Sequence, residues 1–217
     1  MPLRQYRRPA DLPETLAVFP LDGAVLFPRW QLPLNIFEPR YLNMIDDTMS
    51  GSRLIGMVQT TGGPRNQPNL ANVGCVGRVT SYGETDDGRY LITLTGICRF
   101  GFSEELEVQT PYRQVKADYA AYEDDLREPV IIGGKGLRKT LETALEQYAE
   151  ANEIQADWEA VEKAPLETLV HALAAGCPFE PIERQALLEA EDLNARCDAL
   201  IKLLTMNCNP EKEGPLQ

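Results

Sequence analysis

The chain has 217 residues, of which 43% are hydrophobic and 25% charged, an ordinary balance for a globular protein that builds its own core. Its five cysteines are odd in number and none forms a C-x-x-C pair, which argues against a disulfide framework and a zinc ribbon. Residues 1–117 hold 12 Lys+Arg and 12 Asp+Glu, whereas residues 118–217 hold 9 and 21 and carry the whole net charge of −12. Because an acidic half repels phosphate, nucleic acid is disfavoured as a partner.

The N-terminal region lacks the apolar run that a secretory signal requires. No later stretch reaches the roughly 18 apolar residues that cross a bilayer. We therefore expect a cytoplasmic protein with reduced thiols and no membrane segment.

The first half, residues 1–122, has the short apolar runs and turn residues of β structure. The runs at 16–19 and 25–27 are each followed or closed by a proline and predict two short strands. Residues 31–37 alternate in polarity, and Pro33 places that strand at a sheet edge or at a bulge.

One helix near residues 39–50 is expected inside this β-rich half, opening at Pro39 as its first helical residue. The clearest local prediction is a hairpin, since β segments at 73–82 and 90–102 flank an Asp-Gly pair. Such a turn needs positive φ, which glycine adopts without strain. Residues 112–122 continue the β pattern, so the first half is expected to curl into a small barrel-like sheet.

The second half, residues 128–208, changes to a period near 3.6 and predicts a helical bundle. A polar hinge at 122–130 separates it from the first half, and residues 209–217 are expected to form a flexible tail. The one-sided apolar stripes of the three longer helices begin at Leu137, Leu166 and Leu193. A shorter helix is expected around Leu187.

The residues that carry chemistry are few. The single histidine, His171, lies within a predicted helix and has no nucleophile pattern beside it. The run Gly133-Gly134-Lys135-Gly136 lacks the Ser or Thr that a phosphate-binding loop places after its lysine. The hairpin acids lack the glutamate that closes a calcium loop. The sequence therefore predicts no catalytic residue, no metal and no cofactor.

Three sets of segments carry a family signature in a fixed order. They are FPL at 19–21 with VLFP at 25–28 and LPLNIFEPRY at 32–41; VGCVG at 73–77 with DGRY at 87–90 and GICRF at 96–100; and LLEA at 187–190 with DLNARCDAL at 192–200. Together they resemble the amino-terminal substrate-binding domain of Lon proteases over about residues 14–206.

The resemblance implies an α+β fold in which a β-rich, PUA-like pseudo-barrel subdomain precedes an α-helical bundle. It also implies a module that holds unfolded or partner protein segments, as an adaptor or chaperone-like partner of a protease. The printed sequence has no Walker motif and no proteolytic serine, so we expect no enzyme. The signature residues are expected to be mainly structural, and they include Pro33, Phe37, Glu38, Pro39, Arg40, Tyr41 and Arg196.

A peptide-binding patch is predicted where large apolar residues stand between two prolines, at Leu26, Phe27, Arg29 and Trp30. The alternative interpretation is that Phe27 and Trp30 are core aromatics of a small barrel. The sheet edge near Pro33 is a second place where an extended peptide could bind. An RNA- or nucleotide-binding PUA-like protein, a small hydrolase with an unrecognised site and a homo-oligomer remain open.

Overall fold

The computed structural model describes residues 6–64 and 66–208, so the predicted tail at 209–217 lies outside the described residues. Its contacts divide the chain into two compact units, residues 1–128 and residues 129–217. We call them the barrel unit and the helical unit and describe each by itself. Among the described residues, no helix is both long enough and apolar enough to span a bilayer.

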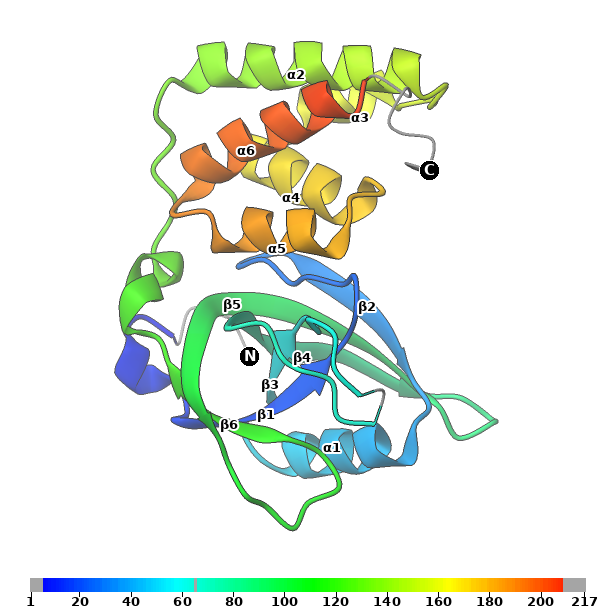
Figure 1. Cartoon of the computed structure of the whole chain (residues 1–217), viewed down its shortest axis with the longest axis vertical. Helices are drawn as coiled ribbons and strands as arrows, with labels where there is room; N and C mark the ends of the chain where they lie inside the picture. Colours follow the sequence, from blue (N-terminus) through cyan, green and yellow to red (C-terminus); the bar gives the residue numbers. More distant parts are fainter. Residues whose placement is uncertain (1–5, 65, 209–217) are drawn as a thin grey trace, which may run out of the picture. The chain divides into compact units, whose positions relative to one another are not determined.

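The barrel unit is built on one six-stranded sheet in the order β2-β5-β4-β3-β1-β6, with β5 also paired to β6 (Figure 1). Because β6 pairs with both β1 and β5, five strands close into a ring, which removes their free edges. Strand β2 stays outside the ring on the first half of β5. The strands are β1 (Thr15–Pro20), β2 (Gln31–Ile36), β3 (Leu54–Val58), β4 (Val73–Glu84), β5 (Tyr90–Glu105) and β6 (Gln114–Asp118).

The prediction of a short strand at 25–27 is wrong, although these residues are buried. The segment instead crosses β5 at Gly96, where an added Cβ would lie 2.0 Å from the carbonyl oxygen of Phe27. Two backbone bonds of 2.9 Å, from Arg29 to Gly96 and from Gly96 to Trp30, fix this crossing. Because glycine has no Cβ, the backbone of this segment can lie directly against β5. The segment packs across the sheet there, and residues 25–27 join no ladder.

Helix α1 (Pro39–Ser50) begins as the sequence predicts, with Pro39 in its first turn and extended Glu38 as its N-cap residue. Its apolar face is buried, and the ring of Tyr41 meets that of Phe19 on β1 edge-on at 4.3 Å between centroids. The helix therefore anchors the turn that follows β2.

The predicted β segment at 112–122 is shorter in the structure, because β6 ends at Asp118 and the 3₁₀ helix η3 (Ala120–Leu126) follows. Asp125 of η3 accepts two bonds from the guanidinium of Arg99, at 2.8 and 2.9 Å, and one from the Arg99 backbone N–H at 2.9 Å. A second 3₁₀ helix, η2 (Pro9–Asp11), precedes β1. The ion pair ties the end of the barrel unit back onto β5.

The helical unit contains α2 (Gly134–Ala151), α3 (Trp158–Lys163), α4 (Leu166–Gly176), α5 (Pro181–Glu189) and α6 (Leu193–Met206). Helix α6 packs against α2, α4 and α5. Asp192 caps α6 by accepting from the Ala195 N–H at 2.8 Å. The sequence missed α3, which spans six residues and buries none, so it has no apolar stripe to recognise.

The predicted α+β class, a β sheet followed by helices, is confirmed. In the helical unit the core includes two polar side chains, since His171 of α4 is 1% exposed and Arg196 of α6 is 3% exposed. Arg196 donates to the carbonyl of Leu187 at 2.8 Å and lies 3.2 Å from the Nε2 atom of His171. A buried guanidinium thus joins α6 to the end of α5 and to α4.

Candidate functional site

The predicted peptide-binding residues are divided between core and surface. Leu26 and Phe27 are 1% and 0% exposed, so their side chains are core side chains of the barrel unit and present no surface. Arg29 and Trp30 are half-buried. Arg29 adopts a φ of 63°, and its guanidinium donates to the carbonyls of Asp125 at 2.5 Å and Arg127 at 3.4 Å. Any ligand contact at this segment is therefore restricted to Arg29 and Trp30.

A cavity of about 260 Å³ lies beside Arg29. Its walls carry charges of both signs, from Arg7, Arg127, Asp125 and Glu128. Ligand pockets for small molecules are usually larger, about 300–1,000 Å³, and mostly apolar. This hollow has the size of one or two side chains rather than that of a cofactor.

A free sheet edge is the second candidate. In an antiparallel pair, residues of non-hydrogen-bonded pairs point their N–H and C=O groups away from the partner strand. The bond from the Gly96 N–H to the Trp30 carbonyl makes Gln31 and Thr95 such a pair. Counting along the register by two, Pro33 and Asn35 stand in the same way. Gln31, Pro33 and Asn35 therefore direct their backbone groups to the outer edge of β2.

Pro33 limits what this edge can bind. It has no N–H, so the outer edge offers the carbonyls of Gln31, Pro33 and Asn35 but donors only at Gln31 and Asn35. Among the described residues, β2 pairs with β5 alone. A proline is tolerated here because its missing donor faces away from the β5 ladder. The edge can accept a strand, but with one bond fewer than a proline-free edge.

Exposed apolar side chains flank the same edge. Phe37 is 63% exposed and Leu91 is 50% exposed, while Pro33 is also exposed. Asn35 pairs with Leu91, and Phe37 follows Asn35 by two residues, directly after the end of β2. We call Pro33, Phe37 and Leu91 the edge patch. It places apolar contacts beside unpaired backbone groups.

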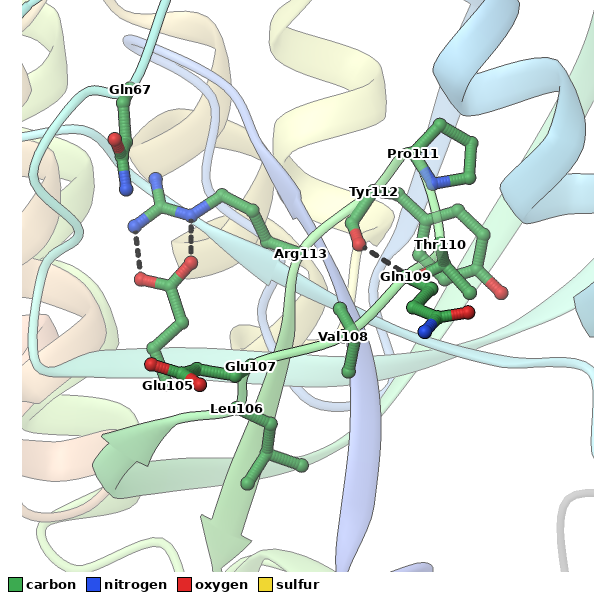
Figure 2. A pocket seen from close by; sticks show the side chains of 10 residues that line it. All are labelled: Gln67, Glu105, Leu106, Glu107, Val108, Gln109, Thr110, Pro111, Tyr112 and Arg113. Carbon is green, nitrogen blue, oxygen red and sulfur yellow. Dashed lines mark hydrogen bonds and ion pairs between the residues drawn. The ribbon is translucent and has the colours of Figure 1, made fainter.

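A cavity of about 750 Å³ lies under the loop between β5 and β6 (Figure 2). Figure 2 shows Arg113 held by both carboxylate oxygens of Glu105, at 2.5 and 2.6 Å. Arg113 also donates to the carbonyl of Pro68 at 2.6 Å. Burial, together with the bond that Tyr112 donates to Asp47 at 2.7 Å, raises the pKa of Tyr112 to about 12. These bonds hold the loop in place. Because Glu105 already neutralises the guanidinium of Arg113, the cavity offers no unpaired Arg113 charge to a ligand.

The titratable groups in the cores are arranged for packing. His171 is buried against Arg196, in the unit that does not hold the cavities described above. Burial raises the pKa of the Cys177 thiol to about 11 and that of Cys197 to about 12, which disfavours the thiolate at neutral pH. Among the described residues, no group of three or more His, Cys, Asp or Glu side chains could hold a metal ion.

The signature residues have identifiable contacts. Arg40 forms an ion pair with Glu38 at 2.8 Å, and its guanidinium lies 4.5 Å above the ring of Tyr41, so both contacts stabilise the start of α1.

Phe37 differs from the residues on either side of it, because its side chain points into solvent. Leu91 was not singled out from the sequence. It belongs to a strand whose neighbouring side chains alternate between core and surface, and only the register reveals its exposure.

The chain is similar to known proteins over most of its length. The family model for the ATP-dependent protease La (LON) substrate-binding domain matches residues 15–206. Lon protease 2 of Myxococcus xanthus is 26% identical over 209 residues, which is 89% of this chain and 24% of that protein. Lon protease of Dictyoglomus thermophilum is 24% identical over 93% of this chain and 26% of its own length.

Two solved structures share the fold. The Lon N-terminal domain protein from Xanthomonas campestris superposes with a TM-score of 0.61 at 21% identity, covering 87% of this chain and 97% of that one. The N-terminal domain of Mycobacterium avium complex Lon protease gives 0.63 at 15% identity, with 88% and 98% covered. The chain thus spans about a quarter of the full-length relatives but nearly the whole of the isolated N-terminal domains.

Proposed function

Because the chain belongs to the ATP-dependent protease La (LON) substrate-binding domain family, we propose that it is a non-catalytic module that binds extended segments of unfolded proteins. The observation that carries this proposal is the edge patch, where the outer edge of β2, which pairs with β5 alone among the described residues, lies beside exposed apolar side chains. Extended peptides bind such edges through main-chain hydrogen bonds, and adjacent side chains supply apolar contact. Recognition of this kind depends little on the peptide sequence.

The bound peptide would run along β2. Its backbone would bond to the outward groups of Gln31 and Asn35, and Pro33 would leave one position without a donor. Its apolar side chains would contact Phe37 and Leu91, which are large and solvent-exposed. The gap at Pro33 weakens any ladder along this edge, including one between two copies of the chain. Weak and reversible binding suits a protein that must release what it holds.

We propose further that the chain passes bound segments to a separate ATP-dependent protease in the cytoplasm. The family supports this role, because its model describes the substrate-binding domain of an ATP-dependent protease, and the curated relatives are themselves Lon proteases.

The proposal is tested by fluorescence anisotropy with fluorescein-labelled casein, an unfolded and acidic protein. The test variant carries Phe37→Ser and Leu91→Ser. The control carries Ile182→Ser, because Ile182 of α5 is 79% exposed and lies in the other unit. Each of the two substitutions removes about half of the apolar contact of a fully buried side chain, which is worth about 1.5–3 kcal/mol. Because the two losses together reach about 1.5 kcal/mol or more, we expect the test variant to bind at least about tenfold more weakly. Equal affinity of the test variant, the control and the wild type would contradict the proposal.

A further inference from the structure

The helical unit has an exposed apolar surface of its own. Ile154, Trp158 and Met206 are 45%, 40% and 53% exposed, and we call them the Trp158 patch. The side-chain amide of Asn152 donates to the carbonyl of Asn207 at 3.1 Å, which joins the end of α2 to the end of α6. Ile154 and Met206 each lie within two residues of this bond. They therefore belong to the same end of the unit.

Trp158 is brought to this end by the course of α3. Arg138, near the start of α2, donates to the carbonyls of Val161 at 2.6 Å and Ala164 at 2.7 Å, near the end of α3. Helix α3 thus returns along α2, and its first residue, Trp158, lies toward the end of α2. The helix buries no residue of its own. A tryptophan left this exposed on a short surface helix is typical of a contact residue.

The chain around Ile154 and Trp158 is acidic, whereas one exposed base, Lys202, lies one turn before Met206 on α6. Residues 140–162 contain acidic side chains but no Lys or Arg. Glu142 pairs with Arg138 and Glu159 with Lys163, and both of these bases lie outside the stretch. The remaining acids of the stretch are exposed and form no ion pair among the described residues; they are Glu146, Glu150, Glu153, Asp157 and Glu162.

The acidic side chains of residues 140–162 indicate which kind of partner can bind the Trp158 patch. A second copy of the chain would bring an identical acidic rim against this one, and phosphate groups would be repelled for the same reason. A segment with Lys or Arg around apolar residues would neutralise the rim and cover the apolar centre. We propose that the Trp158 patch docks a basic amphipathic segment of a partner protein. This surface is separate from the edge patch and does not depend on the function proposed there.

The probe is a fluorescein-labelled amphipathic peptide of Leu and Lys, compared with a peptide in which Glu replaces every Lys and one in which Ser replaces every Leu. We expect the wild type to bind the Leu/Lys peptide with an affinity that falls as salt screens the charges. The other two peptides should bind at least tenfold more weakly. Equal binding of the Leu/Glu peptide, or of the Ser/Lys peptide, would overturn the proposal.

Two variants locate the surface. Trp158→Ala removes the apolar centre, and Glu150→Lys with Glu153→Lys reverses the rim without touching the core. Each should weaken binding of the Leu/Lys peptide at least tenfold, while Ile182→Ala leaves it unchanged. Because the charge variant changes only exposed residues, it decides the matter even if Trp158→Ala unfolds. Wild-type affinity in the charge variant would overturn the proposal.

The same variants separate this inference from the edge-patch function. The Trp158 and charge variants should bind casein as the wild type does, and the Phe37/Leu91 variant should bind the Leu/Lys peptide normally. If the Phe37/Leu91 variant loses the Leu/Lys peptide while the charge variant retains it, the basic segment binds at β2 and the Trp158 proposal is wrong.

Discussion

The ion pair between Arg99 and Asp125 is expected to dominate the stability of the barrel unit. The two side chains are 4% and 9% exposed, and they make two parallel bonds at 2.8 and 2.9 Å. Asp125 also accepts from the Arg99 backbone N–H at 2.9 Å. The perturbation is Asp125→Ala, which leaves a guanidinium and a backbone donor in a nearly dry site.

Breaking a buried pair by removing one partner costs about 3–5 kcal/mol, because the remaining charge is uncompensated. A domain has a free energy of unfolding of about 5–15 kcal/mol, so the loss is a large share of the total. With a urea dependence of about 2 kcal/mol/M, the midpoint should fall by roughly 1.5–2.5 M. Adding Arg99→Met should restore part of the loss, since it removes the stranded charge.

The two tryptophans allow each unit to be followed separately, because Trp30 lies in the barrel unit and Trp158 in the helical unit. In a Trp158→Phe background, urea unfolding by Trp30 fluorescence should show the full effect of Asp125→Ala. In a Trp30→Phe background, the Trp158 transition should not move. A loss below about 1 kcal/mol, the value of an exposed pair, would refute the reasoning.

Three further outcomes follow from single contacts. Gly96→Ala, whose Cβ would lie 2.0 Å from the Phe27 oxygen, should lower the free energy of unfolding of the barrel unit, measured in urea, by about 1–3 kcal/mol or more, whereas Gly83→Ala, with nothing within 4 Å, should not. Asp192→Ala should cost the helical unit about 1 kcal/mol and Asp192→Asn much less. The capped backbone N–H lowers the pKa of Asp192 below 3.8, so thermal melts should show its contribution intact above pH 3.8 and lost as pH falls through the lower value. Under native conditions a thiol reagent should modify half-exposed Cys208, and the four buried thiols only after unfolding; rapid modification of all five would contradict the packing.

Local signals accounted for much of the fold. The Asp-Gly pair predicted the β4–β5 hairpin because its turn needs positive φ, and Gly88 has a φ of 76°. Pro39 marked the start of α1 because its ring presets φ and its missing N–H costs nothing there. Asp192 marked the start of α6 through its side-chain cap. Each of these signals depends on a few neighbouring residues only.

The errors came from long-range contacts. Residues 25–27 have the composition of a strand, but the close crossing at Gly96 removes them from the sheet. Helix α3 is fixed by Arg138, which lies 23 residues before Val161 in the chain. The edge patch depends on the register of Leu91 with Asn35 and on β2 pairing, within residues 6–64 and 66–208, with β5 alone. No window of sequence contains that information.

The most direct test of peptide binding at β2 is amide hydrogen exchange, measured residue by residue by NMR with and without casein. We predict that exchange at Gln31 and Asn35 slows on binding, because their N–H groups face the free edge. The amides of Leu32 and Leu34, which face β5, should be protected already and should not change. Binding of casein with no change at Gln31 and Asn35 would contradict the account and place the substrate elsewhere on the molecule.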